Sequence, residues 1–137
     1  MSIPVINDRD ERRSEPDDTP GTRITVHTMP GASVARIIGD VDLAVAERLR
    51  TTLAAALTVH PWIVVDLGQV EAVDSVGLGV LLAARQTARG NGGDLLLAAA
   101  PPFFLSVLRA ARLDGVFPTY DTLPQAITVA VAGREPA

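Results

Sequence analysis

The chain has 137 residues, and 47% of them are hydrophobic, which is enough for the core of one compact domain. Its formal net charge of −4 at pH 7 lacks the basic excess typical of nucleic-acid binding, so we expect no nucleic-acid partner. The absence of cysteine excludes disulfides, thiolate metal ligands and cysteine nucleophiles. No apolar run has the length of a membrane span, and the charged start over 1–18 lacks the apolar stretch of a signal peptide, so we expect a cytoplasmic protein without membrane insertion.

The first 20 residues carry nine charges and three prolines, with few large apolar side chains. Such a segment cannot bury enough surface to offset the entropy lost on ordering, so we expect a disordered N-terminal tail over 1–20. One folded domain is expected over 21–132, with a frayed C-terminus over 133–137.

A hairpin and a helix are predicted next. Residues 22–28 alternate apolar and polar as a half-buried strand does, "MPG" turns the chain, and 33–39 form a second strand. From residue 45 or 46 to Leu57, apolar residues recur at steps of three and four, which predicts an amphipathic helix. Asp42 is placed to be its N-cap.

The second half of the chain alternates strands and helices. "WIVVDL" is apolar without alternation, as in a strand covered on both faces, and a helix follows from about Ser75 to Arg89. We predict a buried strand over 94–99, a helix opened by the "PP" pair, a short edge strand marked by Pro118, and a closing helix. The order ββαβαβαβα predicts an α/β fold, a small mixed sheet with helices packed on it.

A polar joint separates the strand over 62–67 from the helix that follows it. The simplest interpretation is that Asp74 or Ser75 caps this helix. However, Gly77 and Gly79 each cost a helix interior about 0.8–1.0 kcal/mol relative to alanine, and residues that break local rules often mark functional positions. Glycines in a first turn also leave the backbone bare, so that a partner can approach closely.

Ser75 carries the only hydroxyl of this turn. The first backbone N–H groups of a helix have no partner within it and carry the positive end of the helix dipole. A phosphate on Ser75 would add roughly −1.5 to −2 charges at pH 7. The positive end of the helix would stabilise this charge, whereas the neighbouring Asp74 carboxylate would repel it. We therefore expect the fold to survive phosphorylation while its surface changes sharply, as a switch requires.

"VVDLGQVEAVDSVGLGVLL" resembles the signature of the anti-sigma-factor antagonists, the bacterial branch of the STAS domains. That signature is a strand ending in Asp-Leu-Ser, a few residues, and then Asp-Ser-Ser/Thr-Gly-Leu. "GDVDLAVAERL" over 39–49 resembles the family's Gly-Glu-Leu-Asp segment, and "NGGDLLLAAAPP" with the residues after it resembles the remainder in order and spacing. The resemblance covers about 22–130 and implies a single STAS-like domain.

The resemblance also implies a function. Such proteins, when unphosphorylated, bind an anti-sigma factor that is also a serine kinase, which then releases its sigma factor. Phosphorylation of the serine ends the binding, and a separate phosphoserine phosphatase restores it. The phosphorylated residue corresponds to Ser75, and the ATP belongs to the kinase, so we expect no cofactor and no enzymatic activity in this chain. The implied partner-binding residues are Asp40, Asp42, Asp74, Ser75, Val76, Gly77 and Gly79.

Three positions depart from the family's pattern. Val76 stands where Ser or Thr is usual, which removes the second hydroxyl and puts an apolar side chain beside the switch. Gly68 replaces the serine common after the strand. Arg112 stands where a glycine often ends the third helix, so we expect a different cap there.

Other functions find less support in the residues. A Ser75 triad would need His27 or His60 beside it, and "VDSVG" lacks the G-x-S-x-G elbow of hydrolases. "GLG" over 77–79 is not a dinucleotide fingerprint, and two distant histidines with scattered carboxylates make no metal site. The alternative left open is a STAS module without a switch, which binds a small ligand or is an accessory subunit of a transport or signalling assembly; Ser75 would then only cap the helix.

Overall fold

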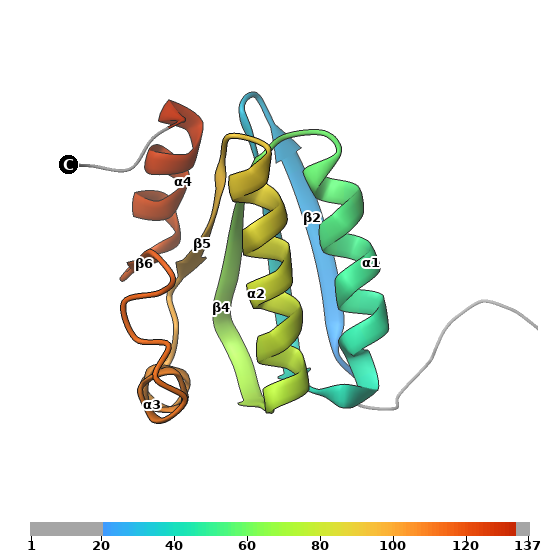
Figure 1. Ribbon diagram of the computed structural model, residues 1–137, viewed down its shortest axis with the longest axis vertical. Helices are drawn as coiled ribbons and strands as arrows, with labels where there is room; N and C mark the ends of the chain where they lie inside the picture. The colour runs from blue at the N-terminus through green and yellow to red at the C-terminus, as the bar shows by residue number, and fades with distance from the viewer. Residues whose placement is uncertain (1–20, 134–137) are drawn as a thin grey trace, which may run out of the picture.

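The computed structural model describes residues 21–133, so the predicted tail over 1–20 and all but the first residue of the predicted frayed end lie outside the described residues. A five-stranded sheet runs through the centre in the order β2-β3-β4-β5-β6 (Figure 1). Its strands are β2 (Arg23–Met29), β3 (Ala32–Val41), β4 (Trp62–Val73), β5 (Asp94–Ala98) and β6 (Thr119–Tyr120). The helical elements are η2 (Leu43–Val45), α1 (Ala46–Leu57), α2 (Ser75–Gly90), α3 (Pro102–Ala110) and α4 (Leu123–Ala132).

The sheet is mixed, as predicted. β2 and β3 form an antiparallel hairpin in which Val26 pairs with Ala35. The pairs β3–β4, β4–β5 and β5–β6 are all parallel. The predicted order ββαβαβαβα is therefore confirmed for the described residues, and β6 lies at the edge of the sheet where Pro118 predicted it.

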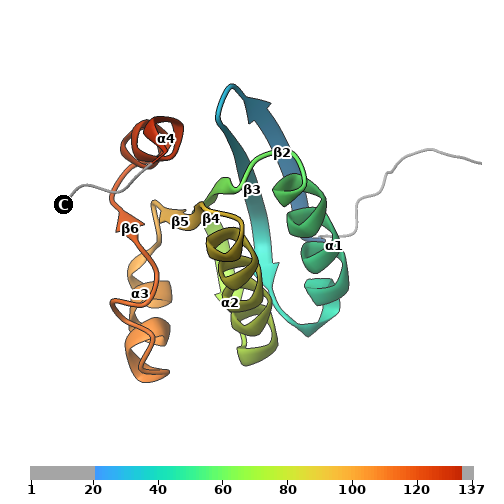
Figure 2. The same cartoon turned by 45° about the horizontal axis from the view of Figure 1, so that its top comes forward.

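Helices cover both faces of the sheet (Figure 2). α1 and α2 lie side by side on one face, where η2 and α1 together contribute the buried stripe Val45, Leu49, Leu53 and Leu57. α3 adds Phe104 and Leu108 to the same core. α4 packs on the other face, where Ala126 and Ala130 meet Val34, Val64 and Leu96.

β4 lies at the centre of the sheet, and its residues alternate between the two cores. Ile63, Val65 and Leu67 belong to the α1–α2 core, and Val64 belongs to the α4 core. This explains why "WIVVDL" is apolar without alternation. The strand also continues beyond the predicted end at Leu67 to Val73, because β3 is long enough to pair with it through two register shifts.

The predicted N-cap of the first helix is wrong. Asp42 makes no side-chain capping bond, and its backbone carbonyl accepts the N–H of Val45 at 3.1 Å instead. That bond closes the short 3-10 turn η2, and α1 begins only at Ala46. The Asp42 side chain therefore does not cap the helix.

The predicted change of cap after α3 is also wrong. Arg112 adopts the left-handed conformation itself, with φ +61°. The N–H of Leu113 donates to the carbonyl of Leu108 at 2.7 Å, which is the closing bond of a Schellman motif. The ordinary cap is thus kept, with arginine in the conformation that glycine usually supplies.

Candidate functional site

Ser75 is the first residue of α2, at the end of the sheet where β4 finishes (Figure 1). The residue is exposed. The hydroxyl lies next to backbone N–H groups that a helix leaves without intrahelical partners. Position and exposure agree with what the sequence predicted for this residue.

Asp74 joins three segments at this point. One carboxylate oxygen, Oδ1, accepts the N–H of Gly77 at 2.9 Å and so caps α2. The other, Oδ2, accepts the N–H of Leu43 at 2.9 Å, which ties η2 to the start of α2. The backbone N–H of Asp74 donates to the carbonyl of Val41 at 3.0 Å, at the end of β3. The Gly77 amide and then the Leu43 amide stabilise the charged form, so the pKa of Asp74 lies below its usual value.

The two glycines of the first turns of α2 have different environments. Gly77 is buried, and a Cβ there would lie 2.3 Å from the carbonyl oxygen of Val41 and 2.6 Å from its Cγ1. Gly79 is exposed, and a Cβ there would meet nothing within 4 Å. The expectation of bare backbone open to a partner therefore fits Gly79. It is wrong for Gly77, which lets α2 pack closely against the end of β3.

The structure separates the two acidic residues of the 39–49 segment. Asp42 immediately precedes Leu43 and therefore lies near Asp74; its Oδ1 is buried and has no hydrogen-bond partner among the described residues. Asp40 lines a different hollow of about 230 Å³, together with Arg23 and Glu71. The Asp40 backbone is held there by the hydroxyl of Thr22, which accepts its N–H at 3.0 Å.

Two exposed apolar residues lie at this end of the molecule. Leu43 is 69% exposed and Val76 is 43% exposed. Val76 was predicted from its departure from the family pattern, whereas sequence reasoning missed Leu43. The available signal was its position, since Leu43 falls outside the buried stripe that begins at Val45.

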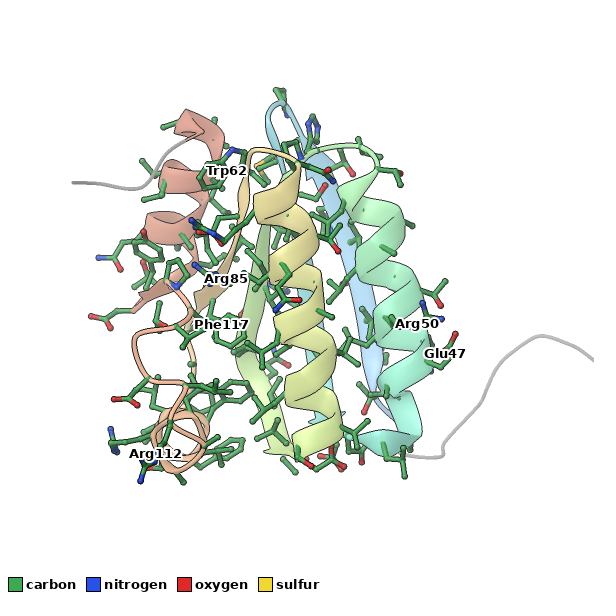
Figure 3. The ribbon with its side chains drawn as sticks, in the orientation of Figure 1. Glu47, Arg50, Trp62, Arg85, Arg112 and Phe117 are labelled. Atoms are coloured by element: carbon green, nitrogen blue, oxygen red, sulfur yellow. The ribbon has the colours of Figure 1, made fainter. Side chains whose placement is uncertain are left out.

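A groove runs along the outer side of the molecule between α1 and α2. Its volume is about 490 Å³ and its lining is mostly apolar. Glu47 and Arg50 form an ion pair on α1, and both side chains are visible in Figure 3. The hydrogen bond from Arg50 holds the pKa of Glu47 below its usual value. The groove is lined by Arg50, Ala54, Leu57, Thr58, Val80, Ala83, Ala84, Thr87 and Asn91.

The histidines lie far from Ser75. His60 precedes the first residue of β4, and Ser75 follows the last, so a strand of roughly 40 Å separates them. His27 pairs with Val34, which pairs with Val64 near the beginning of β4. No Ser75–His triad forms, and within residues 21–133 no group of three or more His, Asp or Glu side chains is placed to hold a metal ion. No helix in this range is both long and apolar enough to cross a membrane.

A mixed five-stranded sheet, with an exposed serine opening the helix after its central strand, is the arrangement expected of a STAS domain. The comparison with known families agrees: the family model described as "Mlab, STAS domain" matches residues 24–133, and the chain belongs to the STAS-domain family. The resemblance read from the sequence is confirmed, as is the fold class.

Several relatives carry the name of one branch of that family. BtrV of Bordetella bronchiseptica, named as an anti-sigma factor antagonist, is 30% identical over 97 residues, which are 70% of this chain and 84% of that protein. The crystal structure of an anti-sigma factor antagonist from Mycobacterium paratuberculosis is 30% identical and has a TM-score of 0.73, covering 80% of this chain and 94% of that one. Unphosphorylated SpoIIAA from Bacillus has the same fold, with 20% identity, a TM-score of 0.67 and coverage of 77% and 93%.

Proposed function

We propose that this chain is an anti-sigma-factor antagonist with a phosphorylation switch at Ser75. The unmodified protein binds an anti-sigma factor with serine kinase activity, and the captured anti-sigma factor releases its sigma factor. Phosphorylation of Ser75 by that kinase ends the binding, and a phosphoserine phosphatase restores it. The names of BtrV and of the Mycobacterium paratuberculosis protein support the general role.

The observation that carries the proposal is the position of Ser75, an exposed residue at the start of a 16-residue helix. A phosphate there adds roughly −1.5 to −2 charges at pH 7, beside N–H groups at the positive end of the helix. Modification therefore leaves the fold intact. SpoIIAA supports this point, since structures with this fold exist for both its unphosphorylated and its phosphorylated form.

The surroundings of Ser75 explain why a phosphate would weaken docking. Leu43 and Val76 are apolar and exposed at the same end of the molecule, so they offer a contact from which water is excluded on binding. A phosphate placed in that contact would have to lose its hydration, which is costly for a charged group without a partner. Asp74 beside it adds repulsion between like charges.

The proposed docking surface consists of the exposed or half-buried residues around Ser75. Asp42, Val76 and Gly79 contribute to it directly, and Asp74 contributes by capping α2 beside Ser75 and by binding the backbone of Leu43. Asp40 is at its margin, in the hollow beside Arg23, and Gly77 acts only by letting α2 pack close to β3. The role is binding; the nucleotide and the catalytic groups belong to the kinase.

The test uses the purified anti-sigma-factor kinases encoded in the same genome as this chain. Each is incubated with the protein and ATP, and intact mass is then measured. We expect one added phosphate with the partner kinase, and none on a Ser75→Ala variant that still binds that kinase. A Ser75→Asp variant should bind more weakly. If Ser75→Asp binds the kinase as tightly as the unmodified protein does, the switch is wrong.

The groove between α1 and α2 favours a second candidate, a STAS module without a switch that binds a small ligand or acts as an accessory subunit. Its volume of about 490 Å³ and its apolar lining fall within the range of small-molecule sites. Native mass spectrometry of the purified protein would then show a bound molecule that an Ala83→Trp variant loses. Under this candidate no kinase would phosphorylate Ser75.

A further inference from the structure

Leu43 is an unusual residue for an exposed turn. It opens η2, a turn of only three residues, and 69% of its surface is exposed, more than any other large hydrophobic side chain within residues 21–133. The core does not hold it in place. Its backbone N–H, however, is bound to Asp74 Oδ2 at 2.9 Å, across 31 residues of sequence.

The Asp74 carboxylate accepts more hydrogen bonds than a helix cap needs. An N-cap requires one side-chain oxygen, and Oδ1 supplies it to the N–H of Gly77. Oδ2 is then free to bind Leu43, so one carboxylate fixes two segments on either side of it. Ser75 directly follows this carboxylate in the chain, so the held leucine lies beside the residue that we propose is modified.

We propose that Asp74 is a positioning residue for docking, which holds Leu43 beside Ser75 as an apolar contact for the anti-sigma-factor kinase. This inference rests on the proposed function. A turn whose backbone is already fixed loses less freedom on binding, so the bond from the Leu43 N–H to Asp74 raises affinity although Asp74 itself does not touch the partner. Aliphatic groups that become buried in an interface contribute through the water they release.

The substitution Asp74→Asn distinguishes the role of the hydrogen bond from Gly77 from that of the hydrogen bond from Leu43. Asparagine caps helices as well as aspartate does, but its amide has one acceptor oxygen in place of two. The variant cannot keep both bonds, and we expect its amide oxygen to stay on the Gly77 N–H, because that bond caps α2, so that the bond to Leu43 is lost. Leu43→Ala removes the contact itself. Val59→Ala is the matched control, because Val59 is 58% exposed and lies after α1, near the other end of the sheet.

Affinity for the partner kinase is measured with ADP in place of ATP, so that Ser75 stays unmodified. We expect Leu43→Ala to bind about tenfold more weakly, Asp74→Asn about fivefold more weakly, and Val59→Ala within about twofold of the wild type. Because Asp74 acts through Leu43, adding Asp74→Asn to Leu43→Ala should change the affinity no further. In the free protein, Asp74→Asn should speed amide hydrogen exchange at Leu43 while Gly77 stays protected.

Each contrary result has its own meaning. If the wild type binds and Leu43→Ala binds equally well, Leu43 is not a contact and the inference is overturned. It is also overturned if Asp74→Asn weakens binding by the same factor with and without Leu43, or if exchange at Leu43 is unchanged by Asp74→Asn. If the wild type binds none of the kinases, the proposed function fails, and the inference fails with it.

Discussion

Gly77→Ala tests how the start of α2 is packed. A Cβ at this position would lie 2.3 Å from the Val41 carbonyl oxygen and 2.7 Å from its carbonyl carbon. These are backbone atoms of β3, which pairs with β4 over most of its length, so they cannot move aside as a flexible side chain would. Overpacking of this kind costs about 3 kcal/mol, and the better helix propensity of alanine offsets about 1 kcal/mol of it. We expect a net loss of about 2 kcal/mol in the free energy of unfolding, measured by urea denaturation.

Gly79→Ala is the matched control, since it is the same substitution in the same helix. A Cβ there meets nothing within 4 Å, so the variant should gain about 0.8–1.0 kcal/mol in the free energy of unfolding. The two variants should therefore differ in sign. Equal stability of Gly77→Ala and the wild type would refute the close packing of α2 against Val41.

Three further predictions concern stability. Arg112→Gly should raise the free energy of unfolding by about 1 kcal/mol in urea denaturation, because it relieves a left-handed conformation with φ +61°; a loss would contradict the Schellman end. Asp94→Ala should lower it by about 3 kcal/mol, because the buried Asp94 carboxylate binds Arg85 at 2.9 Å and Arg89 at 3.0 Å; an unchanged value would mean that these pairs contribute nothing. Backbone amides lower the pKa of the Asp74 carboxylate in the folded protein below the ordinary value of 3.8. The contribution of this carboxylate to the free energy of unfolding is therefore complete above pH 3.8 and is lost as the pH falls through the lower folded-state pKa. Thermal unfolding of the wild type and Asp74→Asn should accordingly converge at acid pH, and a constant difference would contradict this.

The secondary-structure elements followed from hydrophobic periodicity, because most of them bury a well-defined face. The stripe from Val45 to Leu57 and the apolar run of β4 are examples. The length of β4 did not follow, because its second half depends on pairing with β3 across register shifts that no local pattern records. The cap after α3 was mispredicted since Arg112 takes a conformation that its residue type disfavours.

The site was only partly predictable for a related reason. The sequence placed Asp74 and Ser75 at a helix start, and the structure has them there. It could not distinguish Gly77 from Gly79, because that difference depends on the distance to Val41 in another strand. The hydrogen bond between Asp74 and Leu43 joins residues 31 positions apart, and neither local sequence pattern predicts it.

The central claim is that a phosphate on Ser75 abolishes docking without unfolding the protein. Its most direct test is to prepare fully phosphorylated and unmodified protein and to measure, for each, the affinity for the partner kinase and the thermal unfolding midpoint. We predict an affinity at least a hundredfold lower on phosphorylation, which is about 2.7 kcal/mol, with midpoints within a few degrees of each other. Equal affinities, or a phosphorylated protein that is unfolded, would contradict the account.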